Sequence, residues 1–205
     1  MQQPRALGDR LRWLEGGGPI WSKEATAAVT GYKSLALGGW AHHVLATRVA
    51  AGVSSGAAAD EYDLGGTTGT PVSLLPGVTY GSRRTFGVRG FPSGIETGTT
   101  VAVTSAEYRA PLFAPHRGPG LWPVFLDRTS LNVFADAGSA SGGFPGGGSF
   151  ASHWIGSVGA ELSANVGVQY DVPYILRLGL AAPVVNHSGQ HVSDVSAYVS
   201  LGVSF

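Results

Sequence analysis

The histidines are the side chains of this chain best suited to catalysis or metal binding, but their spacing favours neither. His187 and His191 lie four residues apart, a metal-binding spacing on a helix, yet the residues between them are Ser, Gly and Gln, which predict a loop. His42 and His43 begin an expected strand, where neighbouring side chains point to opposite faces. His153 follows a glycine-rich stretch. We therefore expect solvated histidines or histidines of a membrane-interface girdle, with no bound metal and no other cofactor.

The chain also lacks the usual motifs of a nucleophile. It has no Cys, which excludes a thiol nucleophile, a disulfide scaffold and a Cys-ligated metal site. No Gly-x-Ser-x-Gly elbow is expected at a strand-to-helix turn, and there is no His-Glu-x-x-His motif. The run Gly146-Gly147-Gly148 lacks the lysine of a phosphate-binding loop. We predict a protein that is not an enzyme and has no catalytic residues.

The charge of the chain excludes further classes of protein. Its 205 residues include 13 basic and 13 acidic side chains, and only 13% are charged, against roughly 25% in an ordinary soluble domain. A net charge of zero removes the basic patch of a nucleic-acid-binding protein, so we expect no nucleic-acid partner. No stretch has the ~18 apolar residues of a membrane-spanning helix, and the start lacks the apolar core of a signal peptide.

The hydropathy of the chain alternates with a period of two, which predicts strands rather than helices. The last segment shows this best, because from Val195 to Phe205 every odd residue is apolar and every even residue is small or polar. The same alternation predicts five further clear strands, and a weakly alternating strand precedes all of these in the chain. In chain order these are residues 24–37 (the weak one), 43–53, 102–112, 129–137, 156–170 and 174–184.

In the clear strands every charged residue lies on the less apolar face. These residues are Arg48, Glu107, Arg109, Asp136, Glu161 and Arg177. A soluble antiparallel sandwich would alternate too, but it normally covers its solvent face with Lys and Glu, and this chain has only two lysines. The strands are also longer than the ~5–6 residues usual in soluble sheets. We therefore favour a transmembrane barrel, with its apolar face toward lipid and its charged face toward a lumen.

The connections between these strands alternate between long and short. Bacterial outer-membrane barrels have short periplasmic turns and longer outer loops, so the short connections and the C-terminus are expected to be periplasmic. The predicted fold is all-β: an antiparallel transmembrane β-barrel of the bacterial outer membrane, incomplete here with about 7–8 strands. Residues 24–205 would be the C-terminal part of a larger barrel, and residues 1–23 an outer loop or the remnant of a preceding strand.

Five short motifs occur in a fixed order from residue 88 onward. They are Val88-Arg89-Gly90-Phe91 in the longest connection (54–98), then residues 106–112 (AEYRAPL), 134–138 (FADAG), 158–162 (VGAEL) and 176–183 (LRLGLAAP), with Phe205 at the end of the last strand. In order and spacing, residues 38–205 resemble the C-terminal portion of the bacterial surface-antigen superfamily. This superfamily of outer-membrane barrels includes assembly factors of the BamA and TamA type and two-partner secretion transporters.

The resemblance implies that the longest connection folds back into the lumen and that its motif arginine is held there by acidic side chains. Arg89 should then meet Glu107 and Asp136, which the alternation independently places on the lumen face. A planar guanidinium suits this role because it can engage two carboxylates. The alternative is that these two acids pair with Arg109 or Arg177 and leave the loop free.

The remaining motif residues have simpler expected roles. Gly90 would let the backbone turn sharply or approach the wall closely, and Phe91 would pack as an apolar plug. Val88 precedes them in the motif. On the lumen wall we expect Glu161 and Arg177 to form a structural ion pair.

The expected function is that of an outer-membrane barrel segment in a protein insertion, assembly or translocation factor. Its partners would be membrane lipid, client or cargo outer-membrane or secreted proteins, and periplasmic domains of the same full-length parent. Two alternatives remain open: a barrel that anchors or exports an upstream lipase-like domain, and a general structural or porin-like barrel. The superfamily's periplasmic repeats and first barrel strand have no counterpart in this sequence.

Overall fold

The chain folds entirely into strands, turns and irregular loops in the part that the structure describes. The structure is a computed structural model, and it describes residues 8–12, 20–38, 41–56, 59–67, 85–118, 120, 122–142, 153–168 and 172–203. Within these residues no helix has the length and apolar character needed to cross a membrane. The all-β class predicted from the alternation is confirmed.

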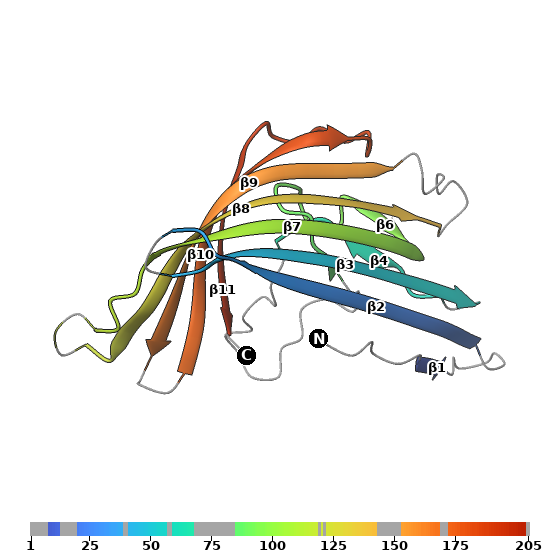
Figure 1. The fold of residues 1–205 in the computed structure, drawn as a ribbon. Coiled ribbons are helices and arrows are strands. Elements are labelled where there is room, and N and C mark those ends of the chain that lie inside the picture. Colours follow the sequence, from blue (N-terminus) through green and yellow to red (C-terminus); the bar gives the residue numbers. More distant parts are fainter. Residues whose placement is uncertain are drawn as a thin grey trace.

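Eight strands form one large antiparallel sheet that curves strongly on itself (Figure 1). Its order is β1-β2-β3-β7-β8-β9-β10-β11, so strands that are neighbours in the sheet also follow one another in the chain, apart from an insertion between β3 and β7. The strands are β1 (Gly8–Arg12), β2 (Ile20–Leu35), β3 (His43–Gly56), β7 (Thr100–Phe113), β8 (Val124–Ser141), β9 (Trp154–Val168), β10 (Val172–Asn186) and β11 (Ser196–Val203).

The strands lie where the alternation predicts them, but most run further than predicted, and β8 and β10 do so past a register shift. β8 begins at Val124 rather than residue 129, and a register shift lies between Leu126 and Arg128. β10 continues to Asn186, past a second shift between Pro183 and Val185. A bulge adds one residue to a strand, so beyond it the odd and even residues change faces. A regular alternation counted from the middle of the strand therefore ends at the bulge, although the strand continues.

The start of the chain adds one more strand to the sheet. Residues 24–37, which alternate only weakly, belong to the long strand β2, and β1 pairs with β2 in antiparallel register from Gly8↔Glu24 to Arg12↔Ile20. Residues 8–12 are therefore in a strand that precedes the predicted set. Among the described residues β1 and β11 each pair with one neighbour, so the sheet is not closed into a barrel there.

The insertion between β3 and β7 builds a second, small sheet inside the curve of the large one. It contains β4 (Tyr62–Leu64), β5 (Thr85–Phe86) and β6 (Glu96–Gly98), in the order β5-β4-β6. Its apolar side chains pack on the concave face of the large sheet and form the one buried core of the described residues. The insertion contributes Tyr62, Leu64, Val88, Phe91 and Ile95, and the large sheet contributes Ala50, Val101, Val103, Ala140 and Ile155.

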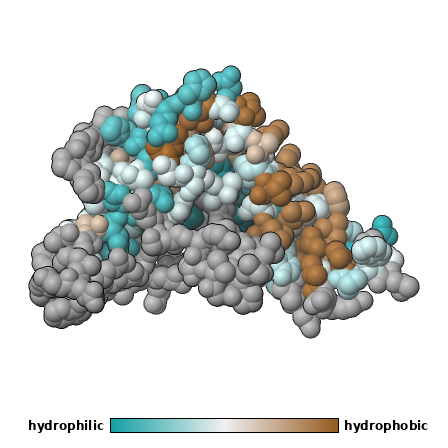
Figure 2. All heavy atoms as spheres, turned by 180° about the vertical axis from the view of Figure 1, so that it is seen from behind, coloured by the Kyte–Doolittle hydropathy of each residue, from teal (hydrophilic) through white to brown (hydrophobic). Residues whose placement is uncertain are grey.

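The two faces of the large sheet differ in exposure, as the alternation predicts. The outer, convex face is apolar but exposed: Val29, Val49 and Val199 are 69%, 56% and 71% accessible. Figure 2 shows such hydrophobic side chains gathered into one broad area of the surface. No second layer covers this face in the described part of the chain, so the arrangement is not that of a sandwich with two apolar faces packed together.

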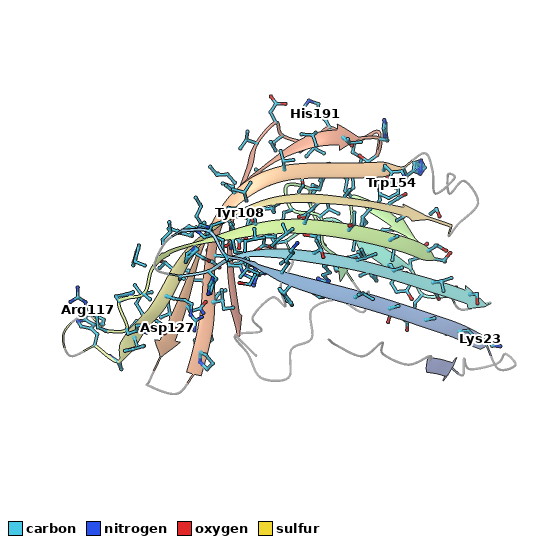
Figure 3. The ribbon with its side chains drawn as sticks, in the orientation of Figure 1. Lys23, Tyr108, Arg117, Asp127, Trp154 and His191 are labelled. Atoms are coloured by element: carbon cyan, nitrogen blue, oxygen red, sulfur yellow. The ribbon has the colours of Figure 1, made fainter. Side chains whose placement is uncertain are left out.

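The strand ends fall into two groups at opposite ends of the sheet. Figure 3 shows Lys23 and Trp154 at the end that carries the long connections, and Arg117 and Asp127 at the end that carries the short ones. The insertion enters and leaves the sheet at the first of these ends. The turn that holds Arg89 reaches from there toward the middle of the concave face.

Candidate functional site

Polar side chains from three neighbouring strands meet near the middle of the concave face. The register pairs Ser105 of β7 with Asp136 of β8, and Asn132 of β8 with Glu161 of β9. Because side chains alternate along a strand, Ser105 and Glu107 share the inner face with Asn132 and Asp136. The sequence thus forms a patch of acidic residues on a wall that is otherwise largely small or apolar.

Arg89 comes from the insertion and pairs with Asp136 through two parallel hydrogen bonds. Its Nε donates to Oδ2 of Asp136 at 2.7 Å, and its Nη2 donates to Oδ1 at 2.9 Å. The backbone N–H of Arg89 also donates to Oδ2, at 3.2 Å. Ser105 adds a fourth bond, from its hydroxyl to Oδ1 at 2.6 Å. The Asp136 carboxylate is buried, and both of its oxygens are satisfied by these donors.

Two further carboxylates surround the guanidinium of Arg89. Its Nη1 donates to Oε2 of Glu107 at 3.3 Å, and Oε2 of Glu161 lies 3.8 Å from the same nitrogen. Both partners expected for Arg89, Glu107 and Asp136, are therefore in contact with it. The alternative pairing is present as well, because Nε of Arg109 donates to Oε1 of Glu107 at 2.8 Å. The two oxygens of Glu107 serve different arginines, so the loop is held despite that pairing.

The ring of Phe134 completes the binding site of the guanidinium. The Arg89 Cζ lies 3.5 Å from the centroid of this ring, in the geometry of a cation–π contact. Phe134 is buried, and it occupies space over Gly159 of the next strand, where a Cβ would overlap the ring. Its role was not predicted from the sequence, although it shares the inner face with Asp136 two residues away. We call the set Arg89, Glu107, Phe134 and Asp136 the loop lock.

The neighbours of Arg89 in the motif fix the backbone of the insertion against the wall. Gly90 has φ of +89°, and a Cβ there would lie 2.9 Å from Cβ of Ala181, so the glycine meets both needs expected of it. Val88 and Phe91 are buried in the apolar core. Gly66 N–H donates to the carbonyl of Phe91 at 2.9 Å and ties the two arms of the insertion together.

The surroundings keep Arg89 charged in a nearly dry site, where its side chain is 3% exposed. Burial by itself lowers the pKa of the Arg89 guanidinium, but the hydrogen bond to Asp136 and the charges of Asp136 and Glu107 raise it further, and the net pKa lies above the ordinary value. The inner face is thus most densely charged around the lock. Beside the insertion it is apolar and buried, through residues such as Val101, Val103 and Ile155.

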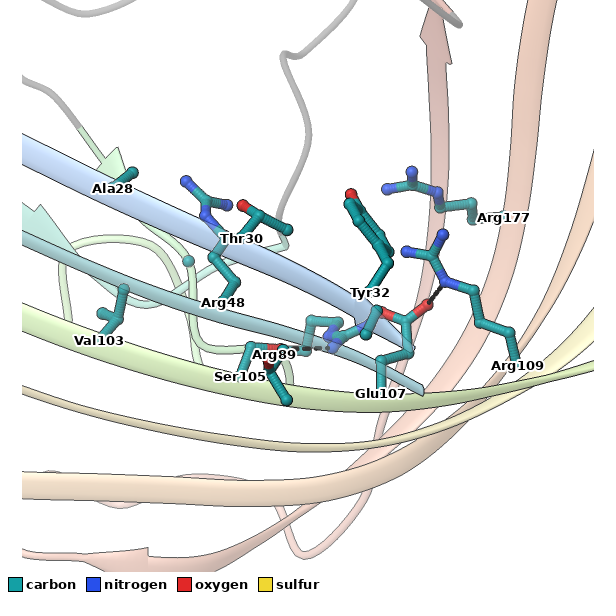
Figure 4. A pocket seen from close by; sticks show the side chains of 13 residues that line it. Ala28, Thr30, Tyr32, Arg48, Arg89, Val103, Ser105, Glu107, Arg109 and Arg177 are labelled. Atoms are coloured by element: carbon teal, nitrogen blue, oxygen red, sulfur yellow. Dashed lines mark hydrogen bonds and ion pairs between the residues drawn. The ribbon is translucent and has the colours of Figure 1, made fainter. Parts of the chain in front are cut away.

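A second group of charges lies beside the lock on the concave face. Arg48, Arg109 and Arg177 line a cavity of about 370 Å³ together with Arg89 and Glu107 (Figure 4). The predicted pair of Glu161 and Arg177 is present at 3.7 Å between Oε1 and Nε. All the charged residues assigned to the lumen wall therefore lie on the concave face, while Phe205 is outside the described residues.

Two residues that were not predicted from the sequence bind Glu161. Nδ2 of Asn132 donates to Oε1 at 3.3 Å, and the Tyr198 hydroxyl donates to Oε2 at 2.9 Å. Both lie on the inner faces of their strands. That position is the only signal the sequence carries for them, because the alternation says which residues share a face but not which of them touch.

The residues considered for catalysis do not form a site in the described part of the chain. His43 stacks on Tyr108, and its Nδ1 lies 2.7 Å from the tyrosine hydroxyl. Gly52-Val53-Ser54-Ser55-Gly56 has the letters of a nucleophile elbow but lies within β3, and no helix occurs among the described residues that follow it. The described residues include no group of three His, Asp or Glu side chains placed to hold a metal ion. The run of glycines at 146–148 lies outside the described residues.

The chain was also compared with known proteins. No protein-family model, no curated protein and no solved structure matches it. Its function must therefore be inferred from the geometry of the site and the two faces of the sheet.

Proposed function

We propose that this chain is the C-terminal part of an outer-membrane β-barrel that helps to insert or translocate other proteins, with the loop lock holding the insertion inside the lumen. One observation carries the proposal: a single curved sheet exposes uncharged apolar side chains on its convex face and buries an arginine-centred cluster on its concave face. In a bilayer the first face would meet lipid, and the second would meet the lumen.

The charges of β2 support a membrane-spanning zone of suitable height. The outer face of this strand carries Lys23 near one end and Lys33 near the other, with Ala25, Ala27, Val29 and Gly31 between them. Ten residues at about 3.3 Å each span roughly 33 Å along the strand, or roughly 23 Å across the membrane at the ~45° tilt of barrels. That height is close to the ~25 Å apolar band of outer-membrane barrels.

The open edge of β11 supports a role beyond that of a passive pore. A strand edge in lipid leaves backbone groups without partners, each costing several kcal/mol, so it has a driving force to pair with another strand. The insertion also fills part of the concave side of the sheet, which does not favour a wide, open channel. The resemblance to the surface-antigen superfamily points to insertion or translocation as the use of such an edge.

Sidedness is tested with single cysteines, since the chain has none of its own. Val49→Cys and Arg48→Cys place a fluorescent label on opposite faces at adjacent positions of β3, and the labelled chains are refolded into vesicles that contain brominated lipid. We expect strong quenching at residue 49 and little at residue 48. Equal quenching at the two positions, or failure of the chain to insert, would contradict the membrane barrel.

The insertion activity is tested separately. A urea-unfolded outer-membrane barrel protein is diluted into vesicles with and without the reconstituted chain, and its folding is followed by heat-modifiability on a gel. We expect faster folding with the chain present and a smaller effect with Arg89→Ala. If the wild-type chain inserts but does not speed folding of the client, the structural or porin-like alternative is favoured. That result would contradict the assembly role but not the membrane barrel.

A further inference from the structure

One row of residues on the concave face joins the last strand of the sheet to the loop lock. Tyr198 of β11 is the register partner of Gly179 on β10, and Gly179 is the register partner of Glu161 on β9. A side chain at residue 179 would block the path between the other two. A Cβ there would overlap the Tyr198 ring, so the glycine lets the ring cross β10.

The ring that crosses β10 ends in a hydrogen bond to a charged group of the site. The Tyr198 hydroxyl donates to Oε2 of Glu161 at 2.9 Å, and the same oxygen lies 3.8 Å from Nη1 of Arg89. Glu161 is buried, with a side chain 4% exposed, so a hydrogen bond donated to its carboxylate contributes more free energy than one donated to a carboxylate at the surface. The position of Tyr198 therefore bears on the position of Glu161 and, through it, on Arg89.

We propose that Tyr198 is a positioning residue that couples the place of the last strand to the loop lock. The idea rests on the proposed function, in which β11 lies at an open edge that recruits another strand. A strand that competes for the edge of β10 would draw β11 away and take the Tyr198 hydroxyl from Glu161. The carboxylate, left with a weaker set of donors, would then hold Arg89 less firmly, and the insertion would be released from the wall.

The structure offers a conservative variant and a matched control. Tyr198→Phe keeps the ring over Gly179 and removes only the hydroxyl. Tyr108→Phe removes a hydroxyl that is also hydrogen-bonded, to Nδ1 of His43 at 2.7 Å, but lies on the outer face away from the lock. Both variants, the wild type, Arg89→Ala, Glu161→Ala and the double variant Tyr198→Phe/Glu161→Ala are refolded into lipid vesicles.

The measurement is hydrogen–deuterium exchange of the peptide that covers residues 85–98, with the strands β8 and β9 as internal references. We expect Tyr198→Phe to speed exchange of this peptide about ten- to hundredfold, the range for losing one hydrogen bond to a charged group. Tyr108→Phe should leave it unchanged. If Tyr198 acts through Glu161, the double variant should exchange no faster than Glu161→Ala alone.

The outcomes separate the coupling from the lock itself. If Arg89→Ala speeds exchange and Tyr198→Phe does not, the coupling is wrong and the lock stands. If neither variant changes the peptide, the proposed lock fails, and the coupling fails with it. Three other outcomes would overturn the coupling and make Tyr198 a general structural residue. The first is faster exchange throughout the reference strands, and the second is additive effects in the double variant. The third is a Tyr198→Phe chain that does not fold although Tyr108→Phe does.

Discussion

Nε of Arg89 lies 2.7 Å from Oδ2 of Asp136, although the two residues are separated by 47 positions in the chain. This contact joins the tip of the insertion to the middle of β8, far from where the insertion leaves the sheet. Glu107 shares the same guanidinium from β7. The insertion starts after β3 and ends before β7. The pair of Arg89 and Asp136 therefore fixes its position on the concave face.

Replacing Arg89 tests how much the insertion depends on this pair. Arg89→Ala should loosen residues 85–98 and lower stability by about 3–5 kcal/mol, because it leaves the buried Asp136 carboxylate without its cation. Limited proteolysis and thermal unfolding measure the two effects. Arg109→Ala is the control, since that side chain is 41% exposed and its pair with Glu107 is worth only about 0–1 kcal/mol. Equal protease resistance of wild type and Arg89→Ala would count against the lock.

Phe134 should contribute to the lock through its ring rather than through its size alone. Phe134→Leu keeps a buried apolar side chain but loses the cation–π contact, so we expect a loss of roughly 1–2 kcal/mol in thermal stability. In a double-mutant cycle with Arg89→Lys the two effects should be strongly non-additive. Strict additivity would mean that the ring packs beside the guanidinium without interacting with it.

Alanine substitutions at Gly90 and Gly94 distinguish the effect of backbone strain from that of contact with the wall. Both have positive φ, +89° and +73°, so alanine strains either position, by about 1–2 kcal/mol. Only at Gly90 would the new Cβ also press on Ala181, at 2.9 Å, whereas at Gly94 the nearest atom is 3.9 Å away. Gly90→Ala should therefore destabilise the fold more than Gly94→Ala, as measured by denaturant unfolding. A reversed order would show that the loop tip does not lie against β10.

The apolar core under the insertion should be as sensitive as that of a globular protein. Leu64 is fully buried, so Leu64→Ala should cost about 2–5 kcal/mol through lost burial and the cavity left behind. Leu180 on the outer face is 57% exposed, and Leu180→Ala should cost far less in detergent. Chemical denaturation of the two variants side by side measures the difference, and similar losses would contradict the division into a buried inner and an exposed outer face.

Local pattern in the amino-acid sequence was enough to predict the strands and their two faces. A period of two fixes which side chains share a face, so the apolar outer face and the inner position of Glu107, Asp136 and Glu161 could be predicted without coordinates. The bulges in β7, β8 and β10 limited this reasoning, because each one exchanges the faces and hides the end of the strand.

Which of the inner residues meet depends on how the sheet and the insertion fold in three dimensions. Register, curvature and the path of the insertion bring Phe134 under Arg89 and Tyr198 across Gly179 to Glu161. None of these contacts has a sequence period, because each joins residues on different strands at distances set by the sheet. The buried apolar core beside the lock could not be predicted from the sequence period either. Alternation alone describes this face as small and polar, and the core forms there because the insertion covers it.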